Sequence, residues 1–198
     1  SDVYKRQGWW PLEGRRYCVT DTTVGRLYGE PVGPLAGRVE VQPGEQAKTL
    51  AEAERVLREL AGLGMSRADH LVALGGGVVG DLGGFCAATY QRGVDVVQVP
   101  TSLVAQVDSA YGGKTGVDLP EAKNYVGAYH QPSAVLADPT TLASLPAEEM
   151  AAGFVEVLKT GLLAGGELWE RVRALDDLEP AGLGDVIFCL LYTSDAAD

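Results

Sequence analysis

The stretch HLVALGGGVVGDLGGFCAATY, residues 70–90, decides the fold. After His70, residues 71–74 form an uninterrupted apolar run, which predicts a buried strand over 70–74. A glycine turn follows at once and leads into a helix of small residues that reaches Tyr90. Gly75, Gly77 and Gly80 satisfy the pattern G-x-G-x-x-G in this strand, turn and helix context. The stretch therefore predicts one unit of an α/β sheet whose turn brings backbone N–H groups close to a pyrophosphate.

Taken alone, the glycine pattern leaves a second interpretation open. Glycines at these positions also permit a tight turn and close packing of the helix on the strand. In an ordinary dinucleotide site an acidic residue closes the next strand, whereas Asp95, about twenty residues on, opens it. The partner of a ribose is therefore not where an ordinary site of this kind places it.

Similar patterns extend outward from this unit in both directions. Short β-rich or apolar runs predict strands, and residues 48–62 show apolar positions at helical spacing before a glycine stop. Alternating strands and helices predict a parallel sheet that binds ligands at the carboxyl ends of its strands. The further predicted strands are 16–20, 38–42, 94–100 and 134–138.

The character of the chain changes near Leu145, where a helical pattern begins with Pro146 in its first turn. Met150, Phe154, Val157, Leu158 and Gly161 follow along one face of this predicted helix. We expect an α/β domain over residues 8–144 and the start of a helical domain over 145–188. We also expect residues 1–7 and 189–198 to be non-native ends of a truncated fragment, because they continue no pattern.

Composition narrows the classes of function. The chain of 198 residues has 46% hydrophobic residues and a net charge of −11, which argues against a nucleic-acid partner. The three cysteines show no C-x-x-C spacing, so neither a disulfide framework nor a structural zinc site is predicted, and a reducing cytoplasm is expected. No apolar run reaches 18 residues, so no membrane span is predicted.

The segment QVDSAYGGKTGVD, residues 106–118, places Asp108 six residues before Lys114 on a glycine-rich turn. A phosphate cradle and a plain exposed loop are both consistent with it. A Walker A loop is not, because Asp108 stands where its first glycine is required and would repel a triphosphate.

Further cations lie in glycine-rich or polar contexts: Arg92, Lys123 beside Asn124, and Lys159. Each alone is typical of a protein surface, but with Lys114 they could form a pocket for a small phosphorylated acid.

Glu156 and Lys159 share a helix face with Ala152, Gly153 and Leu163. This face is consistent with a simple ion pair, or with room for a metal or substrate beside the carboxylate. His70 and His130 show no ligand spacing to Glu156, and we interpret both as structural.

Five motifs, in order, resemble the 3-dehydroquinate synthase family over about residues 15–180. They are PGEQAKTL, LGGGVVGDLGGFCAATYQRGV, VPTSLVAQVDSAYGGKTGVD, AKNYVGAYHQP and LPAEEMAAGFVEVLKTG. The resemblance implies an NAD-binding parallel-sheet domain, a helical C-terminal domain that binds a divalent metal such as zinc or cobalt, and a homodimer.

The resemblance also assigns residues to the site. The catalytic and substrate-binding positions would be Asp108, Lys114, Asn124, Lys159 and Arg92, the arginine reaching the phosphate from the neighbouring subunit. Glu156 would be a metal ligand, completed by two histidines that lie beyond this chain. The cofactor-binding positions would be Asp21, Glu45, Lys48, Gly76, Gly77, Val78, Asp81, Thr101, Ser102, Asp108, Lys123, Ser144 and Glu149. Asp21 and Glu45 would hold the ribose hydroxyls, which accounts for the unusual place of Asp95.

The implied reaction is the NAD- and metal-dependent conversion of 3-deoxy-D-arabino-heptulosonate 7-phosphate to 3-dehydroquinate and phosphate, a lyase step of the shikimate pathway. Another sugar phosphate cyclase, of the 2-deoxy-scyllo-inosose or valiolone synthase type, is an alternative, as are a polyol dehydrogenase and a non-catalytic NAD-binding fragment. The chain departs from the family pattern at Ser102, where threonine is usual, and at Thr23, where asparagine is common. Because the two histidines are missing, we expect this fragment to be inactive alone.

Overall fold

The computed structural model describes residues 10–175 and 180–194. The expected non-native segment 1–7 and the last four residues of 189–198 lie outside this range. The strands are β1 (Arg16–Asp21), β2 (Gly37–Val41), β3 (His70–Gly75), β4 (Val96–Pro100), β5 (Lys114–Leu119), β6 (Ala122–Tyr129) and β7 (Ala134–Val135). The α-helices are α1 (Thr22–Tyr28), α2 (Leu50–Gly62), α3 (Gly77–Thr89), α4 (Ala147–Ala164), α5 (Gly166–Arg173) and α6 (Pro180–Ser194). Short 3-10 helices are η1 (Glu45–Ala47), η2 (Tyr90–Arg92) and η4 (Pro139–Ser144), and η3 (Ala105–Ser109) is a π-helix.

A parallel sheet of strand order β2-β1-β3-β4-β7 forms the centre of the described chain. Every residue of β3 and β4 is buried, as expected for strands covered on both faces. Because the strands are parallel, the last residues of β1, β3 and β4, which are Asp21, Gly75 and Pro100, lie at one edge of the sheet. The predicted α/β class with a parallel sheet is confirmed.

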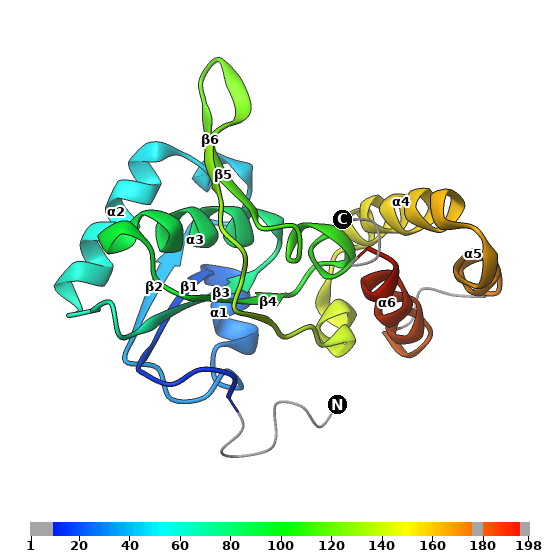
Figure 1. Cartoon of the computed structure of the whole chain (residues 1–198), viewed down its shortest axis with the longest axis horizontal. Helices are drawn as coiled ribbons and strands as arrows, with labels where there is room; N and C mark the ends of the chain where they lie inside the picture. The colour runs from blue at the N-terminus through cyan, green and yellow to red at the C-terminus, as the bar shows by residue number, and fades with distance from the viewer. Residues whose placement is uncertain (1–9, 176–179, 195–198) are drawn as a thin grey trace.

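Helices cover both faces of the sheet, as Figure 1 shows. α2 and α3 pack on one face, where the largest apolar cluster includes Tyr17, Leu60, Leu71 and Leu82. α1 lies on the other face, over a smaller cluster. The predicted helix 48–62 begins at Leu50, because the Thr49 side chain accepts a hydrogen bond from Glu52 N and caps it.

Some predicted elements differ from the structure. β4 begins at Val96 instead of residue 94, and β7 contains two residues of the predicted strand 134–138. The segment 106–118 is not a plain exposed loop, because most of the π-helix η3 and of the strand β5 lie on either side of a short turn at residues 110–113. β5 and β6 form an antiparallel hairpin that stands on α3 and projects from the sheet (Figure 1).

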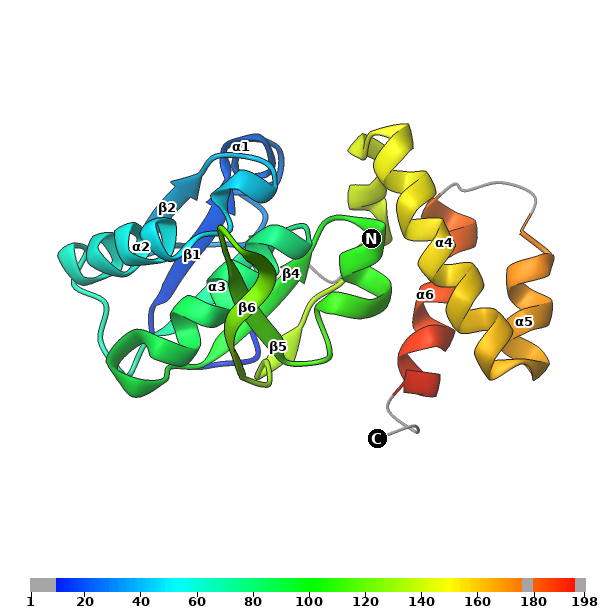
Figure 2. The ribbon, with the colours of Figure 1, turned by 90° about the horizontal axis from the view of Figure 1, so that it is seen from above.

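The C-terminal helices α4, α5 and α6 lie beside the sheet, as Figure 2 shows from above. They surround an apolar cluster that also includes Leu103 and Leu142 from the segments next to them. Met150, Phe154 and Leu158 are partly buried against this cluster. α6 continues through Ser194, and Leu190 is buried in the same cluster.

Gly153 has a packing role on the α4 face that carries Glu156. The small residues of this face are consistent with a simple ion pair or with room for a metal or substrate, and Gly153 is buried. A Cβ atom at this glycine would lie 2.6 Å from Cβ of Leu103, so the small residue allows α4 to pack against the segment after β4. Gly153 is therefore required for the close packing of α4.

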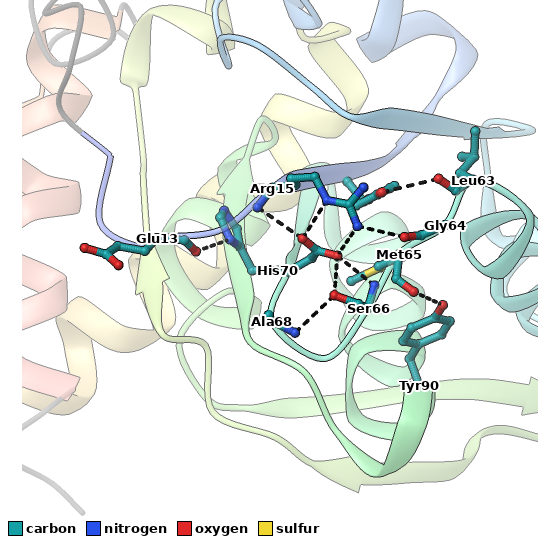
Figure 3. A network of polar contacts seen from close by, with 11 residues as sticks. Glu13, Arg15, Leu63, Gly64, Met65, Ser66, Ala68, His70 and Tyr90 are labelled. Carbon is teal, nitrogen blue, oxygen red and sulfur yellow. Dashed lines mark hydrogen bonds and ion pairs between the residues drawn. The ribbon is translucent and has the colours of Figure 1, made fainter.

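The amino edge of the sheet carries a dense polar network, drawn in Figure 3. Asp69 accepts hydrogen bonds from the side chains of Arg15 and Ser66. His70 accepts a hydrogen bond from Nε1 of Trp10 at 2.7 Å, and its Nδ1 lies 3.1 Å from the carbonyl of Glu13. Both ring nitrogens of His70 thus have partners within the fold, which agrees with a structural role. The described residues contain no helix long and apolar enough to span a membrane.

Candidate functional site

The glycine turn after β3 leaves the start of α3 open to an anion. Gly76 is the N-cap of α3 and gives no side-chain hydrogen bond to the helix, and the first turn carries no acidic residue. The first N–H groups of a helix have no partner inside it, and the helix dipole favours a negative charge at this end. The turn can therefore bind a phosphate or pyrophosphate group.

The packing interpretation applies to Gly75, and the ligand-binding interpretation is consistent with Gly76 and Gly77. A Cβ atom at Gly75 would lie 2.6 Å from Cβ of Val79, so this glycine is required for close packing. A Cβ atom at Gly77 would meet only the Ser109 hydroxyl at 3.4 Å, and one at Gly76 the Ser102 hydroxyl at 3.2 Å. These two glycines border polar groups rather than a packed core.

Other residues assigned to the cofactor surround this turn at the same edge of the sheet. Asp21, at the end of β1, is nearly buried and caps α1, because its Oδ1 accepts hydrogen bonds from Thr23 N and Val24 N at 2.8 and 2.9 Å. Thr101 follows β4 directly, and its N–H donates to the Gly75 carbonyl at 3.0 Å. The sheet thus places these residues around the start of α3.

Lys48 is nearly buried and joins three segments of the site. Its ammonium group forms an ion pair with Asp81 on α3 and a hydrogen bond to Oδ1 of Asn124 on β6. Burial raises the pKa of Asp81, the contact with Lys48 opposes this, and Glu45 and Asp118 raise it further. Nearby, Lys123 forms a longer ion pair with Glu45 at 3.6 Å.

Asp108 lies in the π-helix η3, an element that is found often at functional sites. Gln106, in the same helix, is fully buried, and its Nε2 lies within 3.1 Å of the carbonyls of Pro100 and Asp138 and of the Thr141 hydroxyl. The amide oxygen of Gln106 has no hydrogen-bond partner among the described residues. Gln106 fixes η3 to the end of β4 and to η4, a role that the sequence alone did not indicate.

The hairpin supplies the remaining polar groups. Lys114 begins β5, is exposed, and pairs with Tyr129 on β6. The hairpin comes close to α3 because a Cβ atom at Gly84 would lie 2.5 Å from Cγ2 of Thr115. The glycines of the first stretch therefore also bring the hairpin onto the helix.

A cavity of about 430 Å³ lies between α3, η3 and the hairpin. It brings together four of the residues singled out from the sequence. These are Asp81, Asp108, Lys114 and Asn124. Gly112, from the glycine-rich turn noted in the sequence, also lines it. Sequence reasoning missed the other lining residues, which are Ser109, Thr115, Gly116, Gly127, Ala128 and Tyr129.

A second, larger groove of about 1140 Å³ borders the same edge of the sheet on the α1 side. It includes Thr22, Leu74 and Val99 from the strand ends, and Thr141 from η4. Ser144, also on η4, lies 2.6 Å from the hydroxyl of Tyr28 on α1. Sequence reasoning also missed Tyr28, whose contacts tie α1 to η4.

Several predicted site residues lie outside the smaller cavity. Arg92 is exposed beyond the far end of α3, where Gln91 and Arg92 both have positive φ, 47° and 73°. Glu149 is exposed in the first turn of α4. Within this chain, neither residue joins the group around Lys114.

Glu156 and Lys159 form the ion pair that their spacing predicts. The hydrogen bond to Glu156 raises the pKa of Lys159, and the charge of Asp108 also raises it. The charge of Asp108 in the cavity therefore affects the pKa of Lys159, although Lys159 does not line the cavity. No group of three or more histidine, cysteine or acidic residues is placed to hold a metal ion within residues 10–175 and 180–194.

The matching family model and the curated relatives name the same family. Residues 38–152 match the model described as "3-dehydroquinate synthase N-terminal". The 3-dehydroquinate synthase of Symbiobacterium thermophilum is 50% identical over 170 residues, which are 82% of this chain and 48% of the relative. The chain spans about half the length of the curated relatives it matches.

Two solved structures have the same fold over at least 90% of this chain. The 2-epi-5-epi-valiolone synthase of Streptomyces hygroscopicus, with NAD+ and Zn2+ bound, is 29% identical with a TM-score of 0.86, covering 97% of this chain and 57% of that chain. A 2-deoxy-scyllo-inosose synthase complexed with carbaglucose-6-phosphate, NAD+ and Co2+ is 27% identical with a TM-score of 0.80. That match covers 90% of this chain and 52% of that chain.

Proposed function

This chain belongs to the 3-dehydroquinate synthase family, and from this premise we propose that the complete protein converts 3-deoxy-D-arabino-heptulosonate 7-phosphate to 3-dehydroquinate and phosphate. The family predicted from the five motifs is confirmed. The proposal concerns the complete protein, because the chain spans about half of its relatives. A homodimer, a cytoplasmic location and the domain division at residues 144 and 145 belong to the same proposal.

The cavity between α3, η3 and the hairpin is the observation that carries the proposal. Asp81 and Asp108, assigned to the cofactor, line it together with Lys114 and Asn124, assigned to the substrate. These four residues come from four separate elements, α3, η3, β5 and β6. Their convergence supports a site in which a dinucleotide and a phosphorylated ligand meet.

The residues at the carboxyl edge fit NAD. The uncapped start of α3 suits a pyrophosphate, and Asp21 and Glu45 are carboxylates of the kind that accept hydrogen bonds from ribose hydroxyls. When bound, NAD would accept a hydride from the substrate and return it within the same turnover, so that no net NADH forms.

The chain's own side chains would hold the phosphate while it leaves. The ammonium of Lys114 supplies a point charge, and the amide of Asn124 supplies a directional donor. Since Lys48 already balances the charge of Asp81, Lys114 can act on the ligand. In the elimination a phosphate oxygen would take the proton from the carbon beside the transient ketone, and that C–H electron pair would form the carbon–carbon double bond. The carbon–oxygen electron pair would leave with the phosphate, whose charge Lys114 would stabilise.

The expected metal site, unlike the cofactor site, is not complete within the described residues. Glu156 is paired with Lys159, and the described residues supply no set of three ligands. They do not by themselves fit the metal centre that the resemblance implies. Glu156 is therefore proposed only as one ligand of such a centre.

Phosphate release by the complete protein tests the proposal. With NAD far below the substrate concentration, the sugar acid should release phosphate in stoichiometric amounts without accumulation of NADH. Accumulation of NADH would instead favour a polyol dehydrogenase. NAD binding without phosphate release from any sugar phosphate would favour a non-catalytic binding protein.

A second candidate is another sugar phosphate cyclase, because the valiolone and inosose synthases share the fold at TM-scores of 0.86 and 0.80. The identities favour dehydroquinate synthase, since they are 45–50% to proteins of that name and 26–29% to these cyclases. The same assay with sedoheptulose 7-phosphate and glucose 6-phosphate separates the candidates. Preferential turnover of either compound would replace the proposed substrate.

A further inference from the structure

The hairpin β5–β6 contains an irregular stretch in which its strands do not match residue for residue. Val117 pairs with Val126 in the regular part. The next pair is Leu119 with Ala122, so Asp118 alone faces the three intervening residues of β6. Such a bulge leaves backbone groups without ladder partners and changes the direction in which side chains point.

Asn124 is the middle residue of this bulge and has a left-handed backbone conformation, with φ at 53°. This conformation is uncommon for residues other than glycine and persists only where the surroundings hold it. The N–H of Asn124 donates a hydrogen bond to Oδ1 of Asp118 at 2.6 Å. The Asp118 carboxylate thus replaces the missing ladder partner.

Asp118 also holds Lys48 through its backbone. The N–H of Asp118 donates to the carbonyl of Lys48 at 2.8 Å, and a parallel bridge joins Asp118 to the neighbouring Thr49. The ammonium of Lys48 contacts Oδ1 of Asn124, which closes a ring of three residues. One residue therefore fixes the backbone on both sides of the Lys48 and Asn124 contact.

We propose that Asp118 is a positioning residue, whose carboxylate holds the bulge of β6 so that the Asn124 amide points into the cavity beside Lys114. The inference deepens the proposed function and rests on it, since Asn124 is there a phosphate-binding residue. Asp118 itself does not line the cavity, so its effect passes through Asn124.

The test compares substitutions at Asp118 in the complete protein. Asp118→Ala removes the acceptor and should raise KM for the phosphorylated substrate about tenfold, with a smaller change in kcat. Asp118→Asn keeps an acceptor oxygen at the same place and should stay within about twofold of the wild type. Asp118→Glu keeps the charge but moves the acceptor by one methylene, so it should resemble the alanine variant.

Val126→Ala is the matched control, because Val126 packs the same hairpin on the core and does not line the cavity. It should lower the unfolding midpoint and leave KM unchanged. A KM in Asp118→Ala equal to that of Val126→Ala would overturn the proposal, and so would equal losses in the asparagine and alanine variants. If Asp118→Ala does not fold, Asp118→Glu takes its place. Equal KM values for Asp118→Glu and Asp118→Asn would then overturn the proposal.

Calorimetric titration with inorganic phosphate separates this inference from the proposed function, because it needs no turnover. Phosphate should bind about tenfold more weakly to Asp118→Ala than to the wild type. If the wild type releases no phosphate from the sugar acid but shows this difference, the proposed function fails and the positioning role stands. Equal phosphate affinities would overturn the positioning role even in an active enzyme.

Discussion

Lys48 forms an ion pair with Asp81, 33 residues away, and the Lys48 side chain is only 5% exposed. The pair joins the segment before α2 to α3, beside the cavity. A nearly buried ammonium stays charged at low cost only when its partners are close, and here they are the Asp81 carboxylate and the Asn124 amide oxygen. The site therefore contains a charge balance that exists before any ligand binds.

We predict that Lys48→Met destabilises the protein by about 3 kcal/mol, because it leaves the Asp81 carboxylate largely buried without its cation. The double variant Lys48→Met, Asp81→Asn should recover most of this loss, since it removes both charges. Urea denaturation of the two variants measures the difference. A double variant no more stable than the single one would show that the pair does not behave as a unit.

Lys114→Ala should reduce turnover far more than NAD affinity. Lys114 is exposed at the cavity and has no salt-bridge partner among the described residues, so its removal takes away a charge available to the ligand. The measurements are kcat for phosphate release and the dissociation constant for NAD from a fluorescence titration. Arg58→Ala, on the exposed side of α2, is the control and should change neither. Equal losses in both quantities would assign Lys114 to the cofactor.

Gly112 allows the cavity to be filled without disturbing the fold. A Cβ atom at this glycine would meet no atom within 4 Å, and Gly112 lines the cavity. Gly112→Val should therefore leave the unfolding midpoint nearly unchanged and raise KM. Gly127→Ala is the contrasting variant, because its Cβ would lie 2.1 Å from the Thr115 carbonyl oxygen and should destabilise the hairpin. An unchanged KM in Gly112→Val would place the substrate elsewhere.

Asp69 should make the fold sensitive to acid. The hydrogen bond from Arg15 holds the pKa of this carboxyl well below its usual value of 3.8, and further bonds from Ser66 lower it too, against the opposing effect of burial. Below about pH 4 the unfolded chain takes up a proton that the folded chain does not, so the free energy of unfolding decreases as the pH is lowered.

In numbers, Asp69→Asn should lose about 2 kcal/mol at pH 7 and show a flatter dependence of stability on pH below 4. Chemical denaturation at several pH values measures both effects. Glu54→Gln, which removes an exposed ion pair with Arg58, should have little effect at any pH. A slope in Asp69→Asn as steep as in the wild type would assign the acid sensitivity to other carboxyl groups.

The sequence predicted the parallel sheet because β3 and β4 are mostly apolar runs, and it predicted the glycine turn because of its context between strand and helix. It did not predict the hairpin, since the β6 sequence AKNYVGAY contains polar, charged and glycine positions and no sustained apolar run. Nor could it predict η3, because a π-helix of five residues has no distinctive periodicity. The Lys48 contacts join residues far apart in the chain, and only the fold brings them together.

Much of the cavity wall is main chain. Glycines at 112, 116 and 127 line it, and packing between α3 and β5 fixes its shape. The side chains at its mouth, such as Lys114 and Tyr129, are exposed and contribute little to the core. The exposed side chains of the cavity could therefore be exchanged during evolution while its main-chain wall stayed the same. An ancestral protein with this fold could have acquired new chemistries in this way.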